Sequence, residues 1–134
     1  KRKSETKKAL EILQLLGIEE IAEATSANLP LGYLKRLEVA RALALQPKIL
    51  LLDEPLAGLN QLESRRLANE LFELNRLGQT ILLIEHNLTE VIRICNRIVV
   101  IDNGFKIGEG EPHEVMRDHV VRNAYLGEGY NAAS

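Results

Sequence analysis

The chain has 134 residues, of which 46% are apolar, 27% charged and 4% aromatic, and its formal net charge is −2. This composition is that of a globular protein large enough for one hydrophobic core, and the charge gives no electrostatic reason to expect nucleic acid as a partner. The single cysteine, Cys95, excludes an intrachain disulfide and fits a reducing compartment. There is no signal-peptide pattern and no apolar run near the ~18 residues of a membrane helix. We therefore expect that any function of the protein at a membrane depends on binding to a partner there.

The first third of the chain predicts two helices. Apolar residues recur at three- and four-residue spacings over 4–16, and Gly17 follows where a left-handed residue often ends a helix. Residues 18–30 predict a short helical turn and a loop. A second helix is expected over 31–46, because Pro47 stops it.

A short strand comes next, and the middle of the chain is organised around it. Four consecutive apolar residues, 49–52, predict a fully buried strand of the parallel kind. Asp53 and Glu54 follow, and their side chains should point to opposite sides of the carboxyl end of the strand. Open parallel sheets bind their ligands at that end. Taken alone, Asp-Glu-Pro fits equally well a strand that merely ends in a turn.

The segment after this strand predicts a strand–helix–strand unit. Asn60 is suited to begin a helix that Gly78 closes. The inner face of this helix would consist of Leu67, Leu71 and Leu74. A second buried strand is expected over 80–85, followed by His86. Such crossovers are right-handed and join parallel strands, which indicates an α/β fold.

The last third predicts smaller elements. A short helix is expected over 88–94 and two more over 112–126. Asp102-Asn103-Gly104 lies between two strand-like stretches and predicts a β-hairpin. The predicted fold class is therefore α/β, with parallel strands, helices on both faces, a C-terminal hairpin and short helices.

Three features together indicate chemistry on a phosphate. Gly32 lies in a loop that feeds a helix, and a helix start offers free N–H groups and a positive dipole end. Asp53 can hold Mg²⁺ through water, and Glu54 can orient or deprotonate an attacking water. His86 can reach the same phosphate from the neighbouring strand. Each feature alone is weak, and their order along the chain makes the combination specific.

In this order the motifs resemble those of the ATP-binding cassette (ABC) ATPases. Four motifs match in turn: the signature helix (29–43), the Walker B strand (47–55), the D-loop (56–60) and the switch-histidine segment (83–87). The resemblance continues through 102–104 and 108–115, which are similar to the closing hairpin and helix of the family. It implies the P-loop NTPase type of α/β fold.

The resemblance also implies roles for single residues. Asp53 would bind Mg²⁺, Glu54 would be the catalytic base and His86 would contact the γ-phosphate. Asn60 would lie at the seam of a head-to-tail dimer with a second ATPase subunit. The residues that cap the ATP of the opposite subunit would be Leu29, Pro30, Leu31, Gly32 and Tyr33. Further implications are ATP and Mg²⁺ as cofactors, permease subunits as partners, no nucleic acid, and a peripheral position on the cytoplasmic face of the cell membrane.

The same resemblance suggests a division of the chain and a subfamily. Residues 1–46 would belong to a helical subdomain that carries the signature helix, and 47–134 to the C-terminal part of the ATPase core. Asn60 at the end of the D-loop and the tail 124–128 are most like the branched-chain amino acid importers. A lipopolysaccharide-export ATPase ends in a similar way, so the transported substrate stays open.

Two departures from the family pattern matter. Pro30 and Tyr33 stand where the signature usually has serine and glutamine, and the lost hydroxyl donor is worth roughly 1–3 kcal/mol. Proline is nevertheless tolerated in the first turn of a helix.

The chain also has no Gly-x-x-x-x-Gly-Lys-Ser/Thr P-loop. We therefore expect the C-terminal half of an ABC ATPase domain, which by itself is inactive, and which self-associates or is unstable through its uncovered sheet.

Two other classes of function share some of these features. A nucleic-acid-associated ABC ATPase would bring long coiled-coil heptads before the signature, whereas residues 4–24 predict one short helix. A non-catalytic half-domain that acts as a binding module would have no need of Asp53, Glu54 and His86, which this chain carries.

Overall fold

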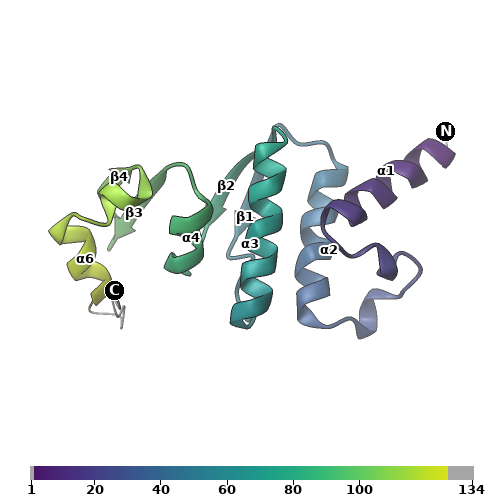
Figure 1. Ribbon diagram of the computed structural model, residues 1–134, viewed down its shortest axis with the longest axis horizontal. Helices are drawn as coiled ribbons and strands as arrows, with labels where there is room; N and C mark the ends of the chain where they lie inside the picture. Colours follow the sequence, from purple (N-terminus) through teal and green to yellow (C-terminus); the bar gives the residue numbers. More distant parts are fainter. Residues whose placement is uncertain (1, 127–134) are drawn as a thin grey trace. The chain divides into compact units, whose positions relative to one another are not determined.

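The computed structural model describes residues 2–126, apart from the side chains of Ser26 and Leu126 (Figure 1). In chain order its elements are α1 (Arg2–Leu15), η1 (Glu19–Ile21), η2 (Ser26–Asn28), α2 (Leu31–Ala44), β1 (Ile49–Asp53), α3 (Gln61–Arg76), β2 (Thr80–Ile84), α4 (Leu88–Ile94), β3 (Ile98–Asp102), β4 (Phe105–Gly110), α5 (Pro112–Val115) and α6 (His119–Leu126). None of the helices in this range is long and apolar enough to cross a bilayer.

The chain forms two compact units, and the boundary between them falls between Glu90 and Val91. The division after residue 46 follows motifs rather than compactness, and it stays a prediction. Residues 127 and 128 of the predicted tail motif lie outside the described range.

The helices predicted for the first unit are present. α1 ends at Leu15, and Gly17 has the left-handed φ of 64° expected of a residue that ends a helix. α2 begins at Leu31 as predicted and ends two residues before the predicted end. The 3₁₀ turns η1 and η2 occupy the stretch predicted as a turn and a loop.

α3 connects two parallel strands, as the strand–helix–strand pattern predicts. β1 and β2 pair in parallel, with Leu50 opposite Ile81 and Leu52 opposite Leu83. Asn60 begins α3 through a capping box with Glu63, in which each side chain accepts a hydrogen bond from the backbone N–H of the other residue. The predicted inner face of α3 is buried: Leu67, Leu71 and Leu74.

The prediction that both strands are fully buried is wrong within residues 2–126. Leu50 is buried, but the side chains that alternate with it point to a face where all four large apolar residues are more than half exposed: Ile49, Leu51, Leu82 and Ile84. Figure 1 shows α3 lying across one side of β1 and β2. Helices in the described range therefore cover one face of this sheet, not both. A continuous apolar run indicates two buried faces, yet one helical layer buries only every second side chain.

The second unit is a hairpin covered by short helices. β3 and β4 pair antiparallel, and the turn residues Asn103 and Gly104 have φ values of 49° and 81°. Two positive φ values in a row define the type I′ turn that Asn-Gly favours, so the predicted hairpin is confirmed. Its core consists of Ile98, Val100, Val115 and Val121. Cys95 packs against this core, and burial raises the pKa of its thiol, which suits a small apolar side chain.

Candidate active site

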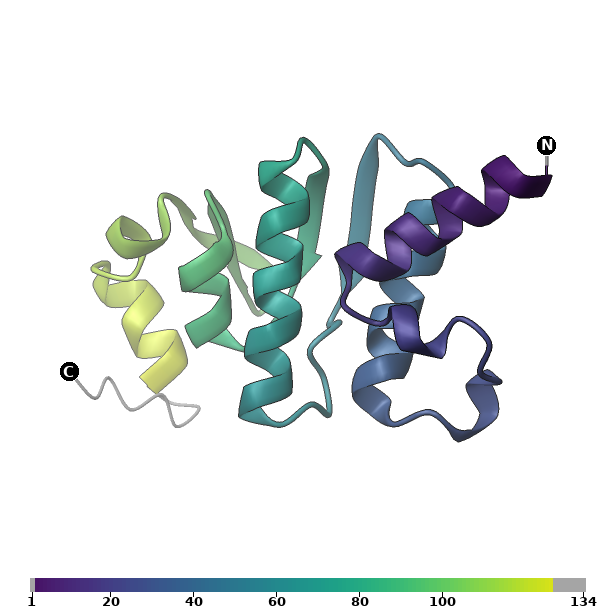
Figure 2. The same ribbon diagram turned by 45° about the vertical axis from the view of Figure 1, so that its right-hand side comes forward.

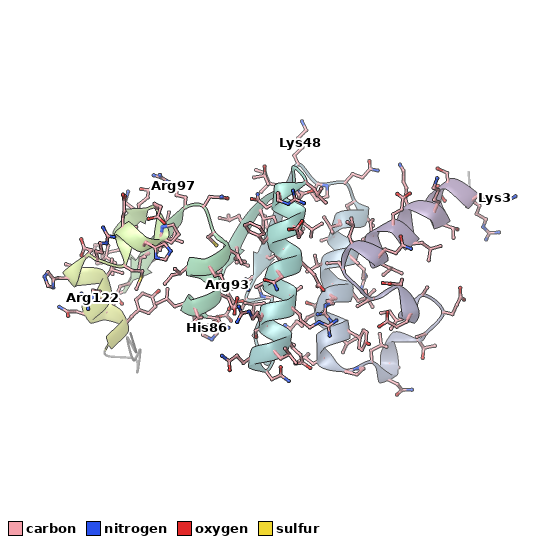
Figure 3. The ribbon with its side chains drawn as sticks, viewed as in Figure 1. Lys3, Lys48, His86, Arg93, Arg97 and Arg122 are labelled. Atoms are coloured by element: carbon pink, nitrogen blue, oxygen red, sulfur yellow. The ribbon has the colours of Figure 1, made fainter. Side chains whose placement is uncertain are left out.

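The predicted catalytic residues gather at one edge of the parallel sheet. β1 and β2 run in the same direction, so Glu54 and His86 follow the strands at the same edge. The backbone N–H of Glu54 donates to the carbonyl of Ile84 at 2.7 Å, which joins the two strand ends. Figure 3 shows His86 at the end of the sheet opposite Lys48, the residue that precedes β1.

Glu54 and His86 contact each other directly. His86 Nδ1 lies 2.8 Å from Glu54 Oε1, and both side chains are exposed. Because a carboxylate only accepts hydrogen bonds, Nδ1 carries the hydrogen in this contact. In the neutral ring Nε2 then has only a lone pair, so a hydrogen bond from Nε2 to a phosphate oxygen requires the protonated imidazolium. His86 can thus orient the Glu54 carboxylate and, when the ring is charged, donate from Nε2 to an anion.

The backbone at Glu54 leaves the strand abruptly. Its φ of 48° lies in the left-handed region, which is uncommon for a residue with a side chain and costs about 1–2 kcal/mol. The N–H of Ala57 donates to the carbonyl of Glu54 at 3.1 Å, which closes a turn directly after β1. Backbone conformations of this kind cluster at functional sites, where the surrounding structure holds them in place.

Glu85 has a structural role that the sequence did not reveal. Its side chain is 1% exposed, and its carboxylate accepts hydrogen bonds from the backbone N–H groups of Leu56, at 2.9 Å, and His86, at 3.2 Å. It therefore fixes the loop after β1 to the end of β2. The sequence shows only a glutamate at the end of an apolar run, because the decisive partner is a backbone group 29 residues away.

The carboxylates at this edge suit a cation that binds one or two protein carboxylates and keeps water and phosphate oxygens as its other ligands. Within residues 2–126, no group of three His, Cys, Asp or Glu side chains could hold a metal ion by itself. Mg²⁺ commonly takes one or two carboxylates and completes its shell with water and phosphate oxygens. The exposed Asp53 and Glu54 fit this mode and do not form an all-protein cage.

The start of α2 offers backbone donors. Pro30 precedes the helix in an extended conformation and its side chain caps nothing. Leu34 N–H donates to the carbonyl of Pro30 at 3.1 Å, so the N–H groups of residues 31–33 precede the first intrahelical donor and have no acceptor within the helix. Gly32 is buried, and the hydroxyl of Tyr33 donates to Glu20 Oε1 at 2.8 Å, which raises the pKa of that hydroxyl. This arrangement is compatible with an anion at the helix start.

The segments 29–33 and 56–60 meet within the first unit. A Cβ atom on Gly58, whose φ is 79°, would lie 2.9 Å from Leu31 Cδ2. Figure 1 shows the N-terminal ends of α2 and α3 at the same end of this unit as the C-terminal ends of β1 and β2. The structure thus brings together Glu54 with His86, and residues 29–33 with the segment that ends at Asn60.

Comparisons with known proteins agree with this geometry. Residues 1–57 match the family model described as ABC transporter, and 106–131 match the model described as branched-chain amino acid ATP-binding cassette transporter. The chain is 44% identical over 117 residues to the high-affinity branched-chain amino acid transport ATP-binding protein LivG of Salmonella typhimurium, covering 87% of the chain and 46% of LivG. It is 33% identical over 123 residues to the lipopolysaccharide export system ATP-binding protein LptB of Escherichia coli K12, covering 92% of the chain and 51% of LptB.

Solved structures of ATP-binding cassettes are also similar to this chain. The ADP conformation of an ATP-binding cassette of an ABC transporter superposes with a TM-score of 0.81 at 34% identity, covering 90% of this chain and 49% of that one. The chain spans about half the length of the curated relatives and of the solved chain that it matches.

Proposed function

Because the chain belongs to the ATP-binding proteins of ABC transporters, we propose that it contributes to the ATP-hydrolysing subunit of an importer for branched-chain or other amino acids. The similarity to LivG over most of the chain supports this substrate class. ABC ATPases bind ATP with Mg²⁺, dimerise and work with transmembrane permease subunits on the cytoplasmic side of the membrane. We propose the same partners and the same peripheral location for the protein that carries this chain.

The proposed chemistry uses the edge of the parallel sheet. Asp53 would ligate Mg²⁺, which when bound offsets the negative charge of the phosphates. Glu54 would accept a proton from the attacking water, and its contact with His86 at 2.8 Å would hold the carboxylate in one orientation. Nε2 of the protonated His86 ring would donate to the γ-phosphate. This contact between Glu54 and His86 is the main observation that supports the proposal.

The proposed nucleotide contacts across the dimer come from residues 29–33 and from Asn60. The N–H groups at the start of α2 would face the γ-phosphate of an ATP held by the opposite subunit. Asn60 would lie at the seam between the subunits. In this proposal residues 1–46 belong to the helical subdomain and 47–134 to the ATPase core, and ATP binding also requires a P-loop, which this sequence does not contain.

An ATPase assay on the natural protein that contains this chain tests the proposal. Replacing a general base lowers the rate by about 10²–10⁴-fold, so we expect a loss of this size in Glu54→Gln with ATP binding retained. Glu73→Gln is the matched control, because Glu73 is an exposed carboxylate on α3. Equal hydrolysis rates in wild type and Glu54→Gln would exclude Glu54 as the base.

Two alternatives predict different experimental results. Similarity to LptB at 33% identity supports a lipopolysaccharide-export ATPase. Uptake of labelled leucine by cells with and without the gene separates the two transport roles, since only the importer proposal predicts a loss of uptake. The remaining alternative is a non-catalytic half-domain that acts as a binding module. It predicts no hydrolysis by the natural protein under any condition.

A further inference from the structure

Arg36 and Glu70 form a largely buried ion pair between α2 and α3. Arg36 Nε lies 2.8 Å from Glu70 Oε2, and the two side chains are 6% and 17% exposed. Figure 2 shows α2 and α3 running in the same direction. The other carboxylate oxygen of Glu70 lies next to Gly17, where a Cβ atom would be 3.5 Å from Oε1. The carboxylate therefore lies where α2, α3 and the end of α1 converge.

The charges of this pair are incompletely compensated. Arg36 Nη2 is buried and has no hydrogen-bond partner among the residues that the structure describes. Burial raises the pKa of the Glu70 carboxyl, and the guanidinium groups of Arg36 and Arg66 oppose that rise without cancelling it. A buried pair of this kind commonly adds no stability over an apolar pair of the same size, and in some proteins such groups specify how the elements pack.

Two further contacts lie toward the N-terminal ends of the same helices. Gly32 precedes Arg36 by one turn, and a Cβ atom at Gly32 would lie 3.6 Å from the Glu63 carboxyl carbon. Glu63 in turn completes the capping box of Asn60. The contact of Leu31 with Gly58, that of Gly32 with Glu63 and the ion pair thus connect α2 to α3 and to the loop before it at three levels.

We propose that Arg36 and Glu70 are positioning residues that hold the segments 29–33 and 56–60 in one fixed arrangement for dimerisation on ATP. This inference rests on the proposed function, in which both segments face the opposite subunit. Two surfaces that must engage one partner at the same time depend on their relative placement, and a misplacement of about 1 Å can cost 10²-fold in rate. The ion pair touches neither segment directly and acts through the helices that carry them.

The test uses the natural protein with three changes in a Glu54→Gln background, which slows turnover. Glu70→Gln leaves the Arg36 charge unpaired. Arg36→Met with Glu70→Leu replaces the pair by apolar side chains of similar size, which should fold at least as stably as the parent. Glu73→Gln removes the carboxylate of the exposed Glu73–Arg76 pair on the same helix and serves as the control. Sedimentation with ATP measures dimerisation, a fluorescent ATP analogue measures binding by the monomer, and thermal unfolding measures stability.

We expect the apolar double variant to melt at or above the parent temperature and to bind the analogue within twofold of the parent, yet to dimerise about tenfold more weakly. Glu70→Gln should show the same dimerisation defect, and the control should behave like the parent. A stable double variant with parental dimerisation overturns the proposal. A double variant that fails to fold also overturns it, since the pair would then serve folding. If the parent neither binds ATP nor dimerises on it, the proposed function itself is wrong.

Discussion

The carboxylate of Glu85 accepts a 2.9 Å hydrogen bond from the backbone N–H of Leu56, and both Leu56 and the Glu85 side chain are buried. Leu56 begins the segment 56–60, and Glu85 directly precedes His86. One buried carboxylate therefore links the loop after β1 to the strand end that carries the histidine. The positions of Glu54 and His86 depend on this link, although Glu85 itself is turned away from solvent.

Removing this carboxylate should destabilise the protein measurably. In Glu85→Ala the buried N–H of Leu56 loses its acceptor, so we expect the free energy of unfolding to fall by about 1–3 kcal/mol. Urea unfolding of the natural protein measures the change. Glu73→Ala on the exposed face of α3 should stay within about 1 kcal/mol of wild type, because exposed ion pairs are weak. Equal losses in both variants would contradict a bridging role for Glu85.

Pro30→Ser should strengthen ATP-driven dimerisation. Serine restores the hydroxyl that the ABC signature usually carries, worth roughly 1–3 kcal/mol toward a phosphate. Because Pro30 caps α2 without a side-chain hydrogen bond, serine at this position should also stabilise the helix by about 0.5–2 kcal/mol. Sedimentation of the natural protein with ATP measures dimerisation. Pro30→Ala is the control, because it removes the ring without adding a hydroxyl. Identical dimerisation of the serine and alanine variants would argue against a missing hydroxyl.

The exposed face of the β1–β2 sheet should make the 134-residue chain self-associate when it is produced alone. Leu51 and Leu82 lie opposite each other on this face, and each is more than half exposed. Burying such a side chain contributes about 1.5–3 kcal/mol, so Leu51→Thr with Leu82→Thr should weaken association at least about tenfold. Sedimentation velocity measures it. Leu62→Gln removes an equally exposed leucine from α3 and should leave association unchanged. A parent chain that is monomeric would refute the prediction.

The hairpin of the second unit carries an acid-sensitive cluster. Lys106 and Arg97 donate to the carboxylate of Glu109 at 2.8 and 2.9 Å, and they lower its pKa from 4.5 to about 2. Because the folded pKa lies below the unfolded one, the cluster stabilises the hairpin above about pH 4.5, and this contribution is lost as the pH falls toward 2. The cluster is exposed, so ~1 M salt should move the pKa back toward 4.5.

Carbon NMR of the Glu109 carboxyl measures this titration directly. Glu109→Gln should remove the corresponding part of the pH dependence of unfolding and leave stability near neutral pH lower than in wild type. A Glu109 carboxyl that titrates at its ordinary value in low salt would show that the two cations do not hold it.

Much of the fold followed from local patterns in the sequence. The Asn-Gly turn, the capping residue Asn60 and the left-handed Gly17 each depend on the conformational preference of one or two residues, which neighbours in the sequence reveal. The spacing of leucines in α3 gave its buried face for the same reason. The order of the motifs along the chain was sufficient to indicate the family.

Burial and long-range polar contacts were decided by the tertiary structure. Four apolar residues in a row did not indicate that one face of β1 is uncovered, because coverage depends on how many layers pack against the sheet. Glu85 and Leu56, or Arg36 and Glu70, are far apart in the sequence, and nothing local marks them as partners. Local geometry and residue identity were thus sufficient to predict the elements and the chemical type of the site. Only packing of the elements decided which charges are buried and which backbone groups they hold.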